Sequence, residues 1–164
     1  MNNMAKTIPI GSDDLMVYPF GNGSERIFEN KILNTNFKNI NLNVHSAAHL
    51  CRATLEGIAF AMIYGIEILK NDGVAIESLK VGNDNLFLSD VFSKTIADTL
   101  GISIQMLEAT GADGAAKASN RVNYGGQIND EIQITKTIKP NPNNQDQSIT
   151  AFEKWKKQLF NNII

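Results

Sequence analysis

Apolar and polar positions alternate along the chain in two patterns, one typical of strands and one typical of helices. Short apolar runs bounded by Gly, Pro, Asn and Asp predict strands, and apolar positions three and four residues apart predict helices. The expected elements are strands at 15–20, 79–81 and 102–107, and helices at 46–70, 89–100, 112–124 and 148–164. The stretch 131–138 predicts an edge strand or an extended arm, whereas the Asn-rich segment 30–44 and the linker 141–147 predict irregular chain.

The longest expected helix, 46–70, has apolar residues over most of its circumference, so we expect it to be largely buried. Ser46 or Asn43 could cap its first turn. Ser89 is a natural N-cap for the next helix, and Gly101 ends it. The C-terminal helix is amphipathic, and one side carries Ile149, Phe152, Leu159 and Ile163.

The order strand, helix, strand over 79–107 is that of a β-α-β unit with parallel pairing, which predicts a layered α/β fold. Ligands of such sheets bind beyond the carboxyl ends of the strands. Two turns, 82–88 and 108–115, occupy those positions and would line one crevice if the strands are neighbours. They form either a nucleotide or phosphate site, or only two tight corners of a packed sheet.

Composition narrows the class of protein. A chain of 164 residues with 43% hydrophobic and 20% charged residues is typical of one soluble globular domain. The net charge of −2 gives no electrostatic reason to expect nucleic acid or an anionic membrane as a partner. The single cysteine, Cys51, excludes an internal disulfide and favours a cytoplasmic location. The longest apolar stretch is interrupted by Gly65 and Glu67 and is too short to cross a bilayer.

Several stretches together resemble one protein family. The motif HLCRATLEGIAF (49–60) fits a pattern of the FGGY carbohydrate kinases, in which a run of polar, aliphatic and small residues ends in an acid. A Pro-ended strand followed by a Gly-x-Glu-Arg turn lies upstream, and a late Gly-Ala-Ala helix follows downstream in the family's order. The resemblance covers residues 9–126 and is greatest to the xylulose kinases of that family.

This resemblance implies that residues 1–164 are a fragment of the C-terminal, nucleotide-side domain of a sugar kinase. The implied fold is an incomplete RNase H-like domain of the actin/hexokinase superfamily, with a mixed sheet flanked by helices. The implied activity is ATP-dependent phosphorylation of D-xylulose to D-xylulose 5-phosphate, with ATP and Mg²⁺ as cofactors. The sugar would bind only together with the N-terminal domain, so we expect the fragment to be inactive alone.

The resemblance also assigns site residues. Nucleotide contacts are expected at Gly82, Asn83, Asn85, Ser89, Gly111 and Gly114. The residues 84–87 stand where relatives have glycines and an alanine, so Asn85 would offer an amide donor in place of a glycine N–H. Asp84 is either a plain turn residue or a contact for ribose hydroxyls. Gly111 and Gly114 also suit close packing, and the family places adenine beside their turn.

No catalytic residue is expected in this chain, because the resemblance places the general base upstream of Met1, and Asp13 and Asp14 do not match its position. His45 and His49 have the i, i+4 spacing of a metal pair. Without a third ligand, a helix cap or a buried hydrogen bond suits them better, and no metal site is expected.

Three structural roles complete the sequence-based expectations. Arg52 and Glu56 are spaced for an internal ion pair. Asp98 suits the support of a helix end, and Trp155 suits packing.

A second class of function stays open from the sequence. The chain could be a stand-alone module of the same fold that binds a nucleotide or a protein partner and has no kinase role. An exposed interdomain face could also support a homodimer.

Overall fold

The computed structural model describes residues 1–109, 112–116, 119 and 133–162. Its helices are α1 (Asn2–Ala5), α2 (Ala47–Asn71), α3 (Asp90–Leu100) and α5 (Pro142–Asn162), with short 3₁₀ turns η1 (Ser12–Asp14), η2 (Glu25–Phe28) and η3 (Asn85–Leu88). Its strands are β1 (Met16–Pro19), β2 (Thr35–Lys38), β3 (Ser78–Gly82), β4 (Ser103–Leu107) and β5 (Ile134–Ile138).

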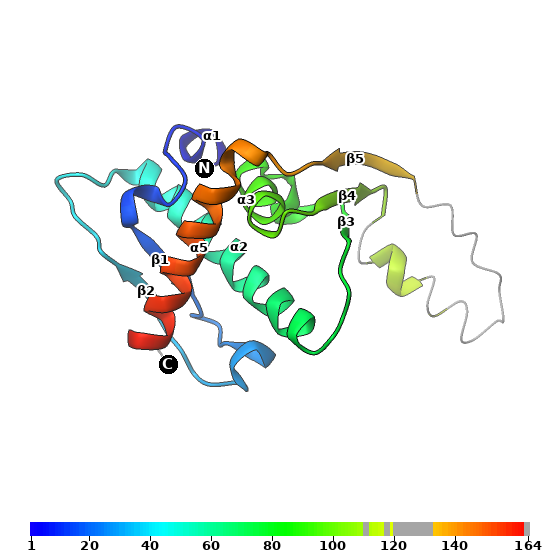
Figure 1. Cartoon of the computed structure of the whole chain (residues 1–164), viewed down its shortest axis with the longest axis horizontal. Coiled ribbons are helices and arrows are strands. Elements are labelled where there is room, and N and C mark those ends of the chain that lie inside the picture. Colours follow the sequence, from blue (N-terminus) through cyan, green and yellow to red (C-terminus); the bar gives the residue numbers. More distant parts are fainter. Residues whose placement is uncertain (110–111, 117–118, 120–132, 163–164) are drawn as a thin grey trace.

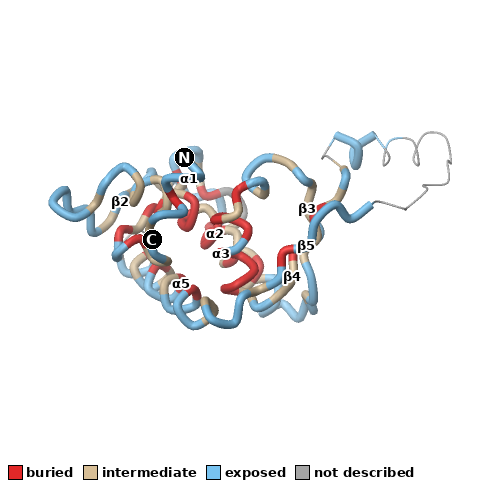
Figure 2. Tube along the Cα trace, turned by 90° about the horizontal axis from the view of Figure 1, so that it is seen from above, coloured by how far each residue is buried: buried red, intermediate tan, exposed pale blue. Residues whose placement is uncertain are grey.

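Two small sheets lie on opposite sides of a central group of helices (Figure 1). β1 and β2 pair antiparallel, whereas β3 pairs parallel with β4 and β4 pairs antiparallel with β5. Figure 2 shows that the buried residues concentrate in α2, α3 and α5, between the sheets. The described helices include none that is both long and apolar enough to span a membrane.

The structure confirms the β-α-β unit and the mixed sheet expected from the sequence. β3, α3 and β4 follow one another with the predicted parallel pairing. Residues 134–138 form an edge strand rather than a free arm, since β5 pairs with β4. Of the helix expected at 112–124, residues 112–116 are helical, and most of the remainder lies outside the described residues.

Two segments expected to be irregular are regular. Residues 35–38 within the Asn-rich stretch form β2, because pairing with β1 supplies hydrogen bonds that the local composition does not favour. The predicted linker 141–147 is instead the start of α5, which begins at Pro142 and not at residue 148. Proline is well tolerated in a first helical turn, and the buried Asp98 carboxylate accepts a hydrogen bond from the backbone N–H of Asn141 at 2.7 Å. Asp98 therefore supports the start of α5.

The N-terminus of α2 is closed by a capping box. Ser46 is the N-cap residue, and its backbone N–H donates to Nδ1 of His49 at 3.1 Å. The other ring nitrogen of His49 lies 3.0 Å from Oδ2 of Asp13. His45 accepts a hydrogen bond from the backbone of Asn41 at 3.1 Å. The expected capping role is confirmed at His49, whereas the hydrogen bonds of His45 are exposed and not buried.

Helix α5 closes the core against β1 and α2. Trp155 is 1% exposed, and its indole N–H donates to the carbonyl of Val17 at 2.9 Å. Tyr18 stacks on the Trp155 ring at 5.1 Å and donates its hydroxyl to the Trp155 carbonyl. Burial raises the pKa of Tyr18 far above its usual range, so the hydroxyl remains a donor at all working pH values. The packing role of Trp155 is confirmed.

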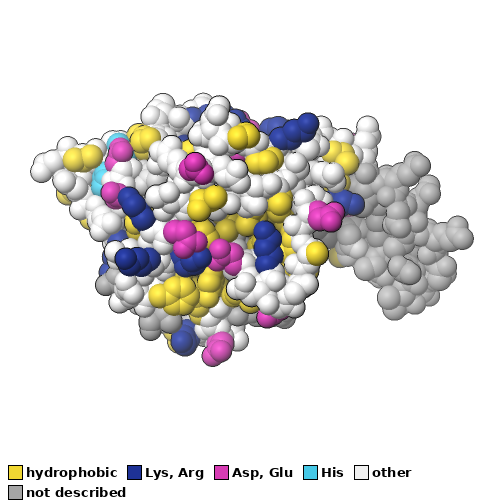
Figure 3. All heavy atoms as spheres, in the orientation of Figure 1, with side chains coloured by type: hydrophobic (Ala, Val, Ile, Leu, Met, Phe, Trp, Pro, Cys, Tyr) yellow, Lys and Arg dark blue, Asp and Glu magenta, His cyan; other side chains and the backbone are white. Residues whose placement is uncertain are grey.

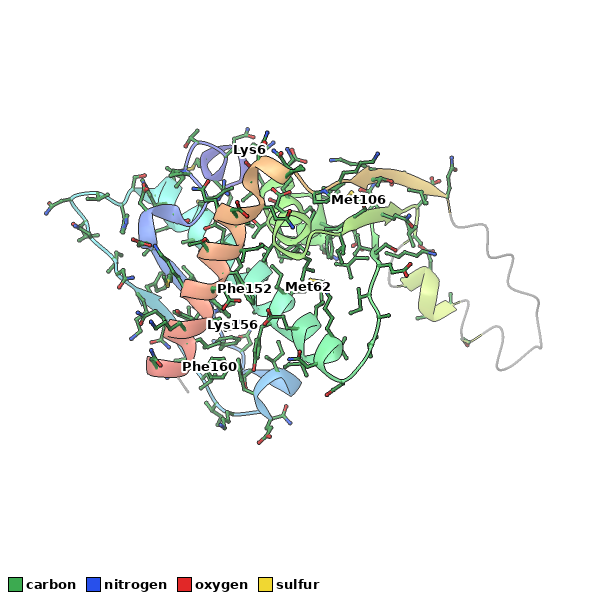
Figure 4. All side chains as sticks on the ribbon, viewed as in Figure 1. Lys6, Met62, Met106, Phe152, Lys156 and Phe160 are labelled. Carbon is green, nitrogen blue, oxygen red and sulfur yellow. The ribbon has the colours of Figure 1, made fainter. Side chains whose placement is uncertain are left out.

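Lys156 links α5 to α2 and lies on α5 between Phe152 and Phe160 (Figure 4), on a face where Figure 3 shows hydrophobic side chains among charged ones. Its ammonium lies 3.0 Å from Glu67, 2.7 Å from Glu153 and 4.8 Å from the centre of the Phe152 ring. Burial acts to lower the pKa of Lys156, but the hydrogen bonds to Glu153 and Glu67 outweigh it, so the net shift is upward. The amine therefore stays charged and holds the two helices together.

Gly57 marks the closest approach of α2 to β1. A Cβ at Gly57 would lie 2.2 Å from the Val17 carbonyl oxygen, a backbone atom that cannot move aside easily. We expect Gly57→Ala to lower the free energy of unfolding by about 1–3 kcal/mol or more, as overpacking does. Gly65→Ala is the matched control on the same helix, because its Cβ would meet only Ile27, at 4.0 Å. We expect it to stabilise by about 0.5–1 kcal/mol.

Chemical denaturation of both variants measures these changes. Equal effects of the two substitutions would contradict the close approach of α2 and β1.

Candidate nucleotide-binding site

The parallel pairing of β3 and β4 brings two turns to one edge of the sheet. The strands run in register from Ser78 opposite Ser103 to Gly82 opposite Leu107, so their carboxyl ends coincide. Beyond them the backbone N–H of Asn83 donates to the Leu107 carbonyl at 3.1 Å. This confirms the prediction that the turns following the two strands are adjacent.

Gly82 allows this close approach. A Cβ there would lie 2.7 Å from the carbonyl oxygen of Ala109, which belongs to the second turn. It would also lie 3.2 Å from Oδ1 of Asp84, so the Asp84 carboxylate folds back beside Gly82. The negative charge of the turn is therefore held near the strand end, beside Gly82.

Asn85 provides the backbone geometry that a glycine would otherwise supply. Its φ is +50°, in the left-handed region, where asparagine is several-fold enriched among non-glycine residues. The side chains of Asn83 and Asn85 are both exposed. The turn thus presents two amide groups to solvent, each with two N–H donors.

Ser89 ends the turn and begins α3. Its hydroxyl accepts a hydrogen bond from the backbone N–H of Phe92 at 3.4 Å, which confirms the predicted N-cap. The residue is only 2% exposed. In this conformation the Ser89 side chain shapes the turn, and the exposed surface beside it comes from the apolar side chains of Leu86 and Leu88.

The second turn is described only in part. Gly111 lies outside the described residues. Gly114 is exposed, and no atom of the described residues lies within 4 Å of the position that its Cβ would occupy. The expectation that Gly114 is a close-packing position is therefore wrong for the described part of the chain.

Carboxylates and histidines elsewhere are engaged in structural contacts. Arg52 and Glu56 form the predicted ion pair at 2.7 Å, with side chains only 11% and 3% exposed. Glu56 also accepts hydrogen bonds from the Gly11 N–H at 3.1 Å and the Ser12 hydroxyl at 2.9 Å. Asp14 pairs with Lys154 at 2.9 Å. The described residues contain no group of three or more His, Cys, Asp or Glu side chains that could hold a metal ion.

The contact between Glu56 and residues 11–12 was not predicted from the sequence. The segment 11–14 has positive φ at every position, including 50° at Ser12, 51° at Asp13 and 68° at Asp14. Such angles are costly for non-glycine residues, and the buried carboxylate of Glu56 stabilises them. Gly11 ahead of a polar triplet was the only local signal of this turn.

Comparison with known proteins identifies one family model that matches residues 6–121, described as "FGGY family of carbohydrate kinases, C-terminal domain". The chain is 25% identical over 121 residues to a xylulose kinase of Haemophilus influenzae, covering 72% of this chain and 24% of the relative. It is 29% identical over 127 residues to an L-xylulose/3-keto-L-gulonate kinase of Escherichia coli, covering 76% and 24%.

Comparison with solved structures shows that the fold is similar to that of carbohydrate kinases. A xylulose kinase from Rhodospirillum rubrum superposes with a TM-score of 0.80 at 22% identity, covering 97% of this chain and 33% of that one. A Plasmodium falciparum glycerol kinase with ADP superposes with a TM-score of 0.71 at 14% identity, covering 96% and 33%. The chain therefore spans about a quarter of the length of its curated relatives and a third of these solved chains.

Proposed function

Because this chain belongs to the FGGY family of carbohydrate kinases, with residues 6–121 matching its C-terminal domain, we propose that it is the nucleotide-binding part of an ATP-dependent sugar kinase. The family membership confirms the resemblance found in the sequence motifs. The structural likeness also confirms the fold, a partial actin/hexokinase-type domain with a mixed sheet flanked by helices.

The observation that carries the proposal is the turn 82–89 at the shared carboxyl edge of β3 and β4. Nucleotides bind at such edges in open α/β sheets. Asn83 and Asn85 would donate hydrogen bonds to ATP or ADP, while Gly82 and Ser89 would fix the shape of the turn. Gly111 and Gly114 would lie beside the base.

The sugar would be phosphorylated between this domain and a second one. Phosphoryl transfer depends on positioning and charge neutralisation, so both substrates must be enclosed. We place the general base upstream of Met1, at the start of this same domain, and most sugar contacts in an N-terminal domain. D-Xylulose is the first substrate to try, because one curated relative is a xylulose kinase and another an L-xylulose/3-keto-L-gulonate kinase.

Magnesium would arrive with the nucleotide. Mg²⁺ usually keeps several waters and binds through substrate phosphates and one or two carboxylates. The described residues near the turn fit that mode, since Asp84 supplies a single carboxylate there. When bound, the ion would neutralise charge on the phosphates.

A non-catalytic module is the second candidate. The observation that favours it is the Asp84 carboxylate within a turn that would have to accept phosphate. Such a module would bind a nucleotide weakly or bind a partner, and a longer chain containing it would not phosphorylate any sugar.

Titration of the isotope-labelled chain with ADP tests the nucleotide site. We expect chemical-shift changes at the amides of 82–89 and 112–116. Asn85→Gly keeps the positive φ but removes the amide donor, so affinity should fall about two- to tenfold, the loss for one hydrogen bond. Asn161→Ala, on the exposed surface of α5, is the control and should change nothing. Shift changes confined to His45 and His49 would place the nucleotide elsewhere and contradict the assignment.

A further inference from the structure

A second cavity lies away from the candidate nucleotide site, between α2, α3, α5 and the segment that follows α1. It has a volume of about 260 Å³ and shares no residue with the turn 82–89. It is lined by Lys6, Ile10, Arg52, Asp90, Val91, Lys94, Thr95, Asp98, Asn144 and Ser148. Figure 4 shows Lys6 beside the first turn of α5 at this place.

Two cationic donors of this cavity lack a full set of partners, and so does one buried hydroxyl. Arg52 uses Nε for Glu56 and Nη1 for the Ile8 carbonyl, so Nη2 has no acceptor among the described residues. Lys94 is exposed and forms no ion pair within the described chain. Ser148 is 1% exposed, and its hydroxyl makes no hydrogen bond to the residues that the structure describes.

The acceptors of the cavity are already occupied. The Asp98 carboxylate accepts from the Asn141 N–H at 2.7 Å and from the Asn144 amide at 3.4 Å. Asp90 is held by Lys6 at 2.7 Å and by Lys136 at 3.2 Å. The hydrogen bonds from these two lysines also lower the pKa of Asp90. A ligand that enters the cavity therefore finds free donors rather than free acceptors.

The net charge of the cavity also favours an anionic ligand. We count the charged residues of the lining together with the residues that pair with them. The set has four cations and three carboxylates: Lys6, Arg52, Lys94 and Lys136, and Glu56, Asp90 and Asp98. The surplus positive charge belongs to Lys94, an exposed residue of the lining. A ligand with one or two negative charges would compensate it.

We propose that this cavity binds a phosphate group. A phosphate presents three acceptor oxygens in a tetrahedral arrangement, so it can meet the guanidinium of Arg52, the ammonium of Lys94 and the hydroxyl of Ser148 from three helices at once. A carboxylate offers only two oxygens in one plane. The volume is far above the roughly 10–15 Å³ that a water needs, so a small organic group attached to the phosphate also fits.

Titration with inorganic phosphate, followed by amide chemical shifts, tests the site. We expect saturable changes at Lys94, Thr95, Asn144 and Ser148. Lys94→Ala should weaken binding about tenfold, the loss for one charge-assisted hydrogen bond, and Lys94→Arg should restore most of it. Lys70→Ala, on the exposed end of α2, is the matched control and should leave the affinity unchanged.

Parallel titrations distinguish the source of the phosphate. Tighter binding of a pentose phosphate than of inorganic phosphate at the same amides would identify an organic phosphate as the ligand, and equal binding would identify the free ion. Linear, unsaturable shifts, shifts at 82–89 alone, or equal losses in Lys94→Ala and Lys70→Ala would overturn the proposal.

Discussion

Replacing Ala59 by aspartate should prevent this chain from folding. Ala59 is 0% exposed and belongs to the hydrophobic core of α2, which also contains Phe60 and Ile63. A carboxylate at this position would be buried without a partner, and an uncompensated buried charge costs about 3–5 kcal/mol, a large share of the stability of a small domain. Circular dichroism and thermal unfolding measure the result.

The same substitution at Ala47 is the matched control. Ala47 is the first residue of α2 and is exposed. A negative charge in the first turn interacts favourably with the helix dipole, so Ala47→Asp should leave stability unchanged or raise it slightly. A soluble Ala59→Asp protein that unfolds cooperatively would show that the centre of α2 is not buried.

We also expect the 164-residue chain alone to transfer no phosphate from ATP to D-xylulose. If the general base lies upstream of Met1, its absence removes a contribution of about 10²–10⁴ in rate. Without the domain that holds the sugar, the positioning of both reactants is lost as well, which can be worth roughly 7–11 kcal/mol. ADP release should therefore equal the uncatalysed background, with and without sugar.

A coupled assay of ADP release decides this prediction, with the whole xylulose kinase of Haemophilus influenzae as the positive control. A longer chain that adds the N-terminal domain should phosphorylate a ketose, with D-xylulose tested first. Turnover by the 164 residues alone would mean that the catalytic residues lie within them. A longer chain that is inactive on every ketose and polyol tested would favour the non-catalytic module.

Local sequence signals were enough to predict the structure wherever residues nearby in the chain determine it. Ser89 and Gly101 mark the ends of α3 because capping depends on residues three or four positions away. Arg52 and Glu56 pair because they are one helical turn apart. The parallel pairing of β3 and β4 also followed from local order, since a short strand–helix–strand unit has few possible arrangements.

Errors arose where contacts distant in sequence decide the structure. β2 exists because β1 pairs with it, and the Asn-rich stretch by itself gives little indication of a strand. The first turns of α5 looked like a linker because their support comes from Asp98 on α3, some forty residues earlier. The turn at 11–14 depends in the same way on Glu56. At the candidate site, the sequence located the turn 82–89 but could not show that Ser89 is buried or that Asp84 folds back.

The position of Trp155 has a consequence for how the protein is made. Its indole N–H donates a hydrogen bond to the carbonyl of Val17, 138 residues earlier. The hydroxyl of Tyr18 donates a hydrogen bond to the carbonyl of Trp155, 137 residues later in the chain. On the ribosome, β1 emerges long before α5, the helix that covers it. Until then, its apolar surface is open to chaperones and to other nascent chains. Contacts of such high sequence separation also slow folding, since the long loop must close before they can form. The yield of folded protein should therefore depend on the speed of synthesis and on temperature more than on equilibrium stability.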